Sequence, residues 1–111
     1  MALARKYRLN RKDLNYVLRQ GKTVRNSFFF IRFLKNETGF LRIAVIVSAK
    51  ILKRAILRNR LKRICTEIIR SGHFLEKSYD LVITATLSIV DKTSKEIKKD
   101  LEETIKKIFS Q

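Results

Sequence analysis

Residues 50–70 read KILKRAILRNRLKRICTEIIR, and this stretch predicts both a helix and the side of it that is buried. At about 100° per residue, one narrow arc of such a helix collects only apolar side chains. Those side chains are Leu57, Leu61, Ile64 and Ile68. We therefore predict a helix from about Leu52 to Ser71, ended by Gly72, that packs this arc against a core.

The opposite side of the same helix is predicted to be basic. The stretch carries a single acid, Glu67, against the cations Lys50, Lys53, Arg54, Arg58, Arg60, Lys62, Arg63 and Arg70. A solvated helix normally mixes charges at i,i+4, whereas Arg54, Arg58 and Lys62 place like charges there. The planar fork of arginine also suits phosphate contacts and base stacking. The pattern favours nucleic-acid binding over a merely solvated face.

The chain before this helix predicts one helix and two strands. Apolar residues at helical spacing indicate a helix over 11–20, which Gly21 ends. Two runs dense in aromatic and β-branched residues predict strands over 26–34 and 40–48. Because the short polar loop between them contains a glycine, a β-hairpin is the simplest connection.

The chain after the basic helix predicts a third strand and a last helix. Apolar and polar residues alternate over 79–86, and apolar residues recur every three or four positions over 93–109. The order is therefore α-β-β-α-β-α. The strand-helix-strand passage over 40–86 suggests a parallel strand pair. We predict an α+β fold, a small sheet with helices packed on it, in one RNA-binding domain spanning 1–111.

The composition indicates a folded and strongly cationic protein. Its 111 residues suffice for one hydrophobic core, and 45% of them are apolar, unlike a disordered basic tail. The net charge is +16, with 26 Lys and Arg against 10 Asp and Glu. Such a charge repels itself in the compact state, so a strongly anionic partner is expected.

Other features narrow the environment of the protein. Cys65 is the only cysteine and His73 the only histidine, so no internal disulfide or cysteine-based metal site is expected. Structural roles are the simpler interpretation of both residues. The absence of disulfides fits a reducing cytoplasm. No signal-peptide apolar region opens the chain, and no apolar stretch nears the roughly 20 residues of a membrane span. We expect no membrane partner.

The stretch RNRLKR at 58–63, preceded by Arg54-Ala55 and followed by Glu67, resembles the signature of the bacterial ribonuclease P protein family. The resemblance extends over nearly the whole chain. It includes a basic start, a short helix, an aromatic strand, the signature helix, a strand led by Tyr79-Asp80 and a C-terminal helix. The ordered spacing is far more specific than a generic run of basic residues.

The resemblance implies a single-domain α/β sandwich with a left-handed β-α-β crossover. It also implies a subunit that binds ribonuclease P RNA and the 5′ leader of precursor tRNA, and that promotes endonucleolytic removal of this leader in the bacterial cytoplasm. Catalysis then belongs to the RNA subunit, which holds most of the Mg²⁺, and no stable protein partner is implied. The implied RNA-binding residues are Arg58, Asn59, Arg60, Lys62 and Arg63 of the signature, with Lys50, Lys53 and Arg54 beside them.

The leader contact is expected on one face of the first predicted strand. Phe28, Phe30 and Arg32 alternate there with a set expected in the core, Phe29, Ile31 and Phe33. Single-stranded RNA is held by basic groups together with rings on which bases stack. The alternative is that every phenylalanine of this strand belongs to the core, as aromatic residues at strand spacing usually do.

The sequence departs from the family pattern at several positions. Leu14 and Leu18 of the first helix stand where the family has aromatic residues that face the leader, so this helix can pack against a base but not stack on it. Thr66 stands where an arginine is common, and Ala44 replaces a strand glycine. These changes bear on the leader side more than on the signature helix.

No residue of the chain is expected to be catalytic. Hydrolysis by the protein would need clustered carboxylates or a positioned base, whereas its acids are dispersed or lie on the last helix among lysines. The main alternative function is a ribosomal or other structured-RNA binding protein, which would not require the RNR spacing. A helix-turn-helix DNA-binding protein would be built from helices. A membrane-surface helix would show exposed Trp or Phe.

Overall fold

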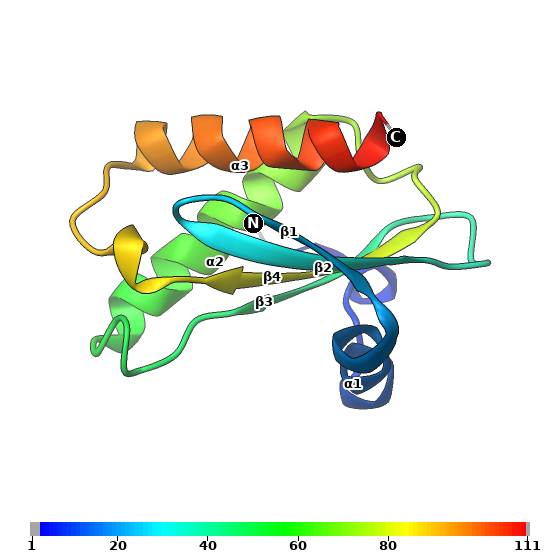
Figure 1. Cartoon of the computed structure of the whole chain (residues 1–111), viewed down its shortest axis with the longest axis horizontal. Coiled ribbons are helices and arrows are strands. Elements are labelled where there is room, and N and C mark those ends of the chain that lie inside the picture. The colour runs from blue at the N-terminus through cyan, green and yellow to red at the C-terminus, as the bar shows by residue number, and fades with distance from the viewer. Residues whose placement is uncertain (1–2, 111) are drawn as a thin grey trace.

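The computed structural model describes residues 3–110, which form four strands and three α-helices (Figure 1). Two short 3₁₀ turns, η1 and η2, complete the secondary structure. In chain order the elements are η1 (Arg5–Tyr7), α1 (Arg11–Gln20), β1 (Lys22–Arg25), β2 (Phe29–Lys35), β3 (Arg42–Ile46), α2 (Ala55–Ser71), β4 (Tyr79–Ala85), η2 (Leu87–Ile89) and α3 (Ser94–Phe109).

The strands form one sheet in the order β1-β2-β4-β3. The predicted parallel pair around the basic helix is confirmed, because β3 runs parallel to β4. The expected hairpin between the second and third predicted elements is wrong, because β4 lies between β2 and β3 and pairs with both. β2 forms its hairpin with β1 instead, a strand that the sequence pattern did not reveal.

The central place of β4 has a physical cause. Leu81, Val82 and Ile83 are consecutive and fully buried, so both faces of this strand are covered. A strand buried on both faces is a continuous apolar run and belongs inside a sheet. The alternation predicted over 79–86 suits a strand with one open face and is therefore wrong for β4.

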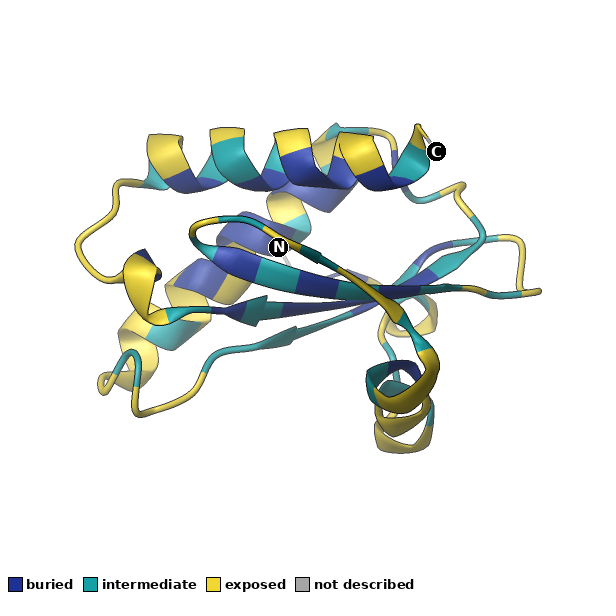
Figure 2. Cartoon of the chain, viewed as in Figure 1, coloured by how far each residue is buried: buried dark blue, intermediate teal, exposed yellow. Residues whose placement is uncertain are grey.

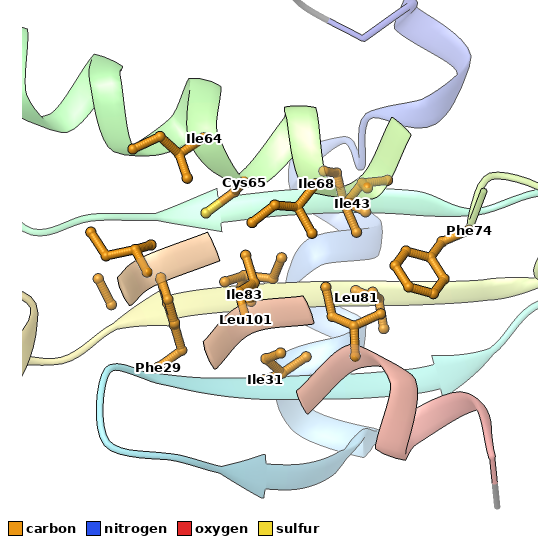
Figure 3. Close-up of a cluster of buried hydrophobic side chains, with 14 of the residues drawn as sticks. Phe29, Ile31, Ile43, Ile64, Cys65, Ile68, Phe74, Leu81, Ile83 and Leu101 are labelled. Atoms are coloured by element: carbon orange, nitrogen blue, oxygen red, sulfur yellow. The ribbon is translucent and has the colours of Figure 1, made fainter. Parts of the chain in front are cut away.

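The main core lies between one face of the sheet and the helices α2 and α3, which both cover that face (Figure 1). Figure 3 shows Phe29, Ile31, Leu81 and Ile83 of the sheet in one cluster with side chains of α2, such as Ile68, and with Leu101 of α3. The prediction that Phe29, Ile31 and Phe33 face the core is confirmed, because all three are buried. α3 begins with a capping box between Thr93 and Glu96, which satisfies backbone N–H groups that the helix itself cannot.

α1 packs alone on the opposite face of the sheet (Figure 1). Its bounds match the prediction, and its one fully buried residue is Val17. Gly21 follows, where an added Cβ would lie 2.7 Å from the carbonyl oxygen of Val17 and 3.0 Å from that of Phe33. The glycine therefore lets α1 turn directly into the hairpin of β1 and β2.

α2 begins at Ala55, three residues later than predicted, and its first turn extends past the core. Leu61, Ile64 and Ile68 are buried as expected, but Leu57 is 37% exposed, so its assignment to the core was wrong. Figure 2 shows this exposed end of α2. None of the described helices is both long and apolar enough to cross a membrane.

Candidate nucleic-acid interface

The outward side of α2 presents the signature residues to solvent. Asn59, Arg60, Lys62 and Arg63 are exposed, while the buried residues of the same helix fix its position on the sheet. Residues 59, 62, 63 and 66 are spaced so that they share one side of a helix. The predicted basic stripe is therefore a fixed surface on a rigid element.

Arg58 occupies a different position from its neighbours. It is half-buried, and its Nη1 donates to the carbonyl oxygens of Leu52 and Lys53, at 2.8 Å each. These bonds hold the segment before the helix against its first turn. Arg58 thereby positions Lys50, Lys53 and Arg54, which are all exposed. Arg58 is therefore the predicted RNA-binding residue whose guanidinium bonds to the protein's own backbone, at the carbonyl oxygens of the consecutive residues Leu52 and Lys53.

Among the described residues, two polar contacts between side chains join α2 to α3. Arg60 Nη2 lies 3.0 Å from Ser94 Oγ, and Lys98 Nζ lies 3.3 Å from Glu67 Oε1. Both residues of the second pair are exposed, so this ion pair adds little stability. It does turn the single acid of the signature stretch toward α3. The side of α2 that faces away from α3 thus carries basic and neutral polar groups.

The N-terminal segment completes this basic surface, which the sequence did not indicate. The N–H of Leu9 donates to the carbonyl oxygen of Ile43 at 2.9 Å, so the segment runs along the free edge of β3. Arg8 is thereby brought to a groove of about 490 Å³ between β3 and α2. Its lining consists of Leu3, Arg8, Leu9, Ile43, Ala44, Val45, Asn59, Lys62, Arg63 and Thr66. The only available sequence signal was the density of cations near the start of the chain.

The candidate leader residues divide between two surfaces. Arg32 lies on the face covered by α1, where its Nη1 donates to the carbonyl oxygen of Leu18 at 2.5 Å. Phe30 is half-buried and stacks with Arg25, whose guanidinium carbon lies 5.3 Å from the ring centroid. Leu14 and Leu18 are half-buried on α1. A basic and aromatic face therefore exists beside α1, although part of the charge of Arg32 is used to hold that helix.

Phe28 does not join this surface, so the expectation that it shares a face with Phe30 and Arg32 is wrong. Phe28 precedes β2 and packs against the main core, on the side of α3. Lys92 Nζ lies 5.5 Å from its ring centroid. The strand begins one residue later than the alternation assumed, because Asn26 Oδ1 accepts from the N–H groups of Phe28 and Phe29 and forms a turn there.

The isolated cysteine and histidine have no role in this surface. Burial raises the pKa of the Cys65 thiol to about 12, so the thiol is neutral and inert at physiological pH. His73 is exposed and has a left-handed backbone with φ 60°, just after α2. Within residues 3–110, no three His, Cys, Asp or Glu side chains gather where they could hold a metal ion.

The geometry agrees with what comparison of the sequence finds. The family model named Ribonuclease P matches residues 3–109. The ribonuclease P protein component of Clostridioides difficile is 34% identical over 97 residues, covering 86% of this chain and 84% of that protein. The corresponding protein of Clostridium botulinum, strain Langeland, is 36% identical over 98 residues, covering 86% and 87%.

Solved structures of the same kind have the same fold. The ribonuclease P protein of Staphylococcus aureus superposes with a TM-score of 0.85 at 27% identity, covering 92% of this chain and 94% of that one. The protein from Thermotoga maritima gives a TM-score of 0.79 at 28% identity, covering 90% and 96%. This chain therefore shares its overall fold with both proteins.

Proposed function

This chain belongs to the ribonuclease P protein family, and as a protein component of that enzyme we propose that it binds the catalytic RNA through the outward side of α2. The observation that carries the proposal is the continuous basic surface formed by the signature helix and the N-terminal segment. Asn59, Lys62 and Arg63 are exposed on one rigid helix, and Arg8 reaches the same side across the edge of β3. Among residues 3–110, no carboxylate lines the groove between them. Arg60 is exposed on the flank of the helix toward α3, where it bonds to Ser94.

We further propose that the face of the sheet beside α1 contacts the 5′ leader of precursor tRNA. Phe30 with Arg25 provides a ring and a cation on adjacent strands, which suits a stacked base and its phosphate. Leu14 and Leu18 of α1 can pack against a base of the leader, but they offer no ring on which that base could stack. Arg32 contributes positive charge there while it holds the carbonyl of Leu18.

The protein would act by counter-charge and positioning, with cleavage by the RNA subunit. We propose that the Mg²⁺ of the reaction is held mainly by the RNA subunit. Positive side chains at phosphates replace bound cations and lower the electrostatic cost of bringing two RNA chains together. The protein's contribution should therefore be largest when Mg²⁺ is scarce.

Reconstitution with a bacterial ribonuclease P RNA tests this proposal. The protein should accelerate removal of the 5′ leader at low Mg²⁺, and the purified chain alone should cleave nothing. Arg60→Ala should weaken the effect at least tenfold. Lys107→Ala provides the control, because it removes the same charge from an exposed position on α3. Equal losses from both variants, or cleavage by the chain without RNA, would contradict the proposal.

A further inference from the structure

The groove between β3 and α2 has an apolar floor and a basic rim. Its floor is formed by the side chains of Leu3, Leu9, Ile43 and Val45 together with Ala44. Its rim is formed by Arg8 on one side and by Asn59, Lys62, Arg63 and Thr66 on the other. The volume of about 490 Å³ lies within the usual range of small-molecule sites, roughly 300–1,000 Å³.

The floor also offers backbone hydrogen-bonding groups. β3 is an edge strand, so alternate residues direct their N–H and C=O groups away from the sheet. Ile43 is one of these residues, because its carbonyl oxygen accepts from Leu9. Val45 lies two positions further along and has the same orientation. Among the described residues, no N–H or C=O group pairs with Val45 along this free edge.

We propose that this groove binds one unpaired nucleobase of the catalytic RNA, an inference that rests on the proposed function and adds a specific contact to it. The apolar floor would cover the face of the base, while Asn59 and the edge of Val45 would bond to its polar rim. An asparagine amide both donates and accepts, as a base edge requires. Arg8, Lys62 and Arg63 would hold the flanking phosphates.

Two observations favour a base over an extended peptide as the occupant. The N-terminal segment already pairs at Ile43, which leaves only a short free edge for strand addition. In the part of the chain that the structure describes, the rim carries three cations and no acid, which fits a polyanion. The groove is also open because residue 66 is small, and the hydroxyl of Thr66 donates to the carbonyl oxygen of Arg63 instead of crossing the space.

Two variants test the groove without changing its charge. Asn59→Leu keeps the volume but removes the amide, and Thr66→Leu adds carbon beside it, whereas Thr66→Ser keeps the space and is the matched control. Each full-length variant is titrated with a bacterial ribonuclease P RNA transcript, and base reactivity in the complex is mapped with reagents that modify unpaired Watson–Crick edges. Thermal melting of each variant shows that it is folded.

We expect one unpaired base to be protected in the wild-type complex and in the Thr66→Ser complex. In the Asn59→Leu and Thr66→Leu complexes, that base should regain reactivity while protection of the backbone elsewhere persists. Affinity should fall by about five- to hundredfold for Asn59→Leu, the range for loss of a bidentate base contact. If both leucine variants bind as tightly as wild type with the same base reactivities, no base occupies the groove.

The outcome separates this inference from the proposed function. Should the wild-type protein bind the RNA and lose affinity on Arg60→Ala while the groove variants stay normal, only the nucleobase site fails. Should the wild-type protein not bind the RNA at all, both fail together.

Discussion

Arg42 and Asp80 are joined by two parallel hydrogen bonds, from Nε to Oδ1 at 2.9 Å and from Nη2 to Oδ2 at 2.8 Å. Asp80 is only 5% exposed and also accepts from Asn36. The third nitrogen of Arg42 reaches Asp13 on α1 at 2.9 Å. One guanidinium therefore holds the α1 helix, β3 and β4 together, and the carboxylate of Asp80 raises the pKa of Arg42.

Replacing Arg42 by leucine should lower the free energy of unfolding by about 3–5 kcal/mol, because it leaves the Asp80 carboxylate buried without its cation. Urea unfolding at neutral pH measures this loss. Lys98→Ala is the control, since it breaks the exposed pair with Glu67 and should cost less than about 1 kcal/mol. Similar losses from both substitutions would show that burial of Asp80 does not govern the effect.

Replacement by alanine should lower the stability of the protein at Arg58 but hardly at Arg60, whereas RNA affinity should fall at Arg60. Arg58→Ala removes two charged hydrogen bonds to backbone carbonyls, so the free energy of unfolding should fall by roughly 1–3 kcal/mol in addition to any loss of RNA affinity. Arg60→Ala breaks only the exposed hydrogen bond to Ser94, so it should lower stability by no more than about 0.5 kcal/mol and still weaken RNA binding. Denaturant melts and RNA titrations of the same preparations distinguish the two. Equal stability losses would be inconsistent with the bonds of Arg58.

RNA affinity should fall steeply as salt is raised, because each neutralised phosphate releases counterions. A plot of log affinity against log salt concentration should become less steep by about 0.7–0.9 when Arg63→Ala removes one contact. Lys107→Ala should leave the slope unchanged. A flat response of the wild-type protein would mean that the basic side of α2 does not bind phosphates.

The buried thiol of Cys65 should make stability fall in alkaline solution. Burial raises its pKa from 9.0 to about 12, so the unfolded chain releases the proton first as pH rises. The contribution is complete below about pH 9 and then declines by about 1.4 kcal/mol per pH unit towards pH 12. The difference in unfolding free energy between wild type and Cys65→Ala should shrink over this window. Parallel pH profiles would show that the thiol is not buried in this way.

Gly21→Ala should destabilise the fold although its backbone φ is ordinary. The added Cβ would lie 2.7 Å from the Val17 carbonyl oxygen, which is backbone and cannot turn aside. Overpacking of this kind costs about 1–3 kcal/mol. Thermal melting measures it, with Gly39→Ala as a contrast, since Gly39 has open space but a φ of 83° that favours glycine. A melting temperature unchanged by Gly21→Ala would rule out the close approach.

Local patterns predicted the helices well. The 11–20 helix and the last helix have the expected bounds within one residue, because apolar spacing and Gly21 are signals within the segment. The basic side of α2 followed for the same reason. Leu57 was misplaced because helical spacing gives the direction of a side chain but not how far the core extends beneath it.

Local sequence patterns do not predict which segments far apart in the chain contact one another. The position of β4 between β2 and β3 depends on pairing across the chain, although the buried run Leu81-Val82-Ile83 was a usable signal. Arg8 was missed because its position depends on pairing of the N-terminal segment with β3. Phe28 was misplaced because a turn formed by Asn26 shifts the start of the strand.

The interior position of β4 also constrains the order of assembly during synthesis. The hairpin of β1 and β2 and the helix α2 contain only local contacts, and both are translated before residue 79. β2 and β3 have no common neighbour until β4 emerges, so the core that holds α2 forms late. A nascent chain therefore exposes its cationic signature helix before the sheet holds that helix in place. An RNA that binds at this stage contacts a helix whose orientation is not yet defined.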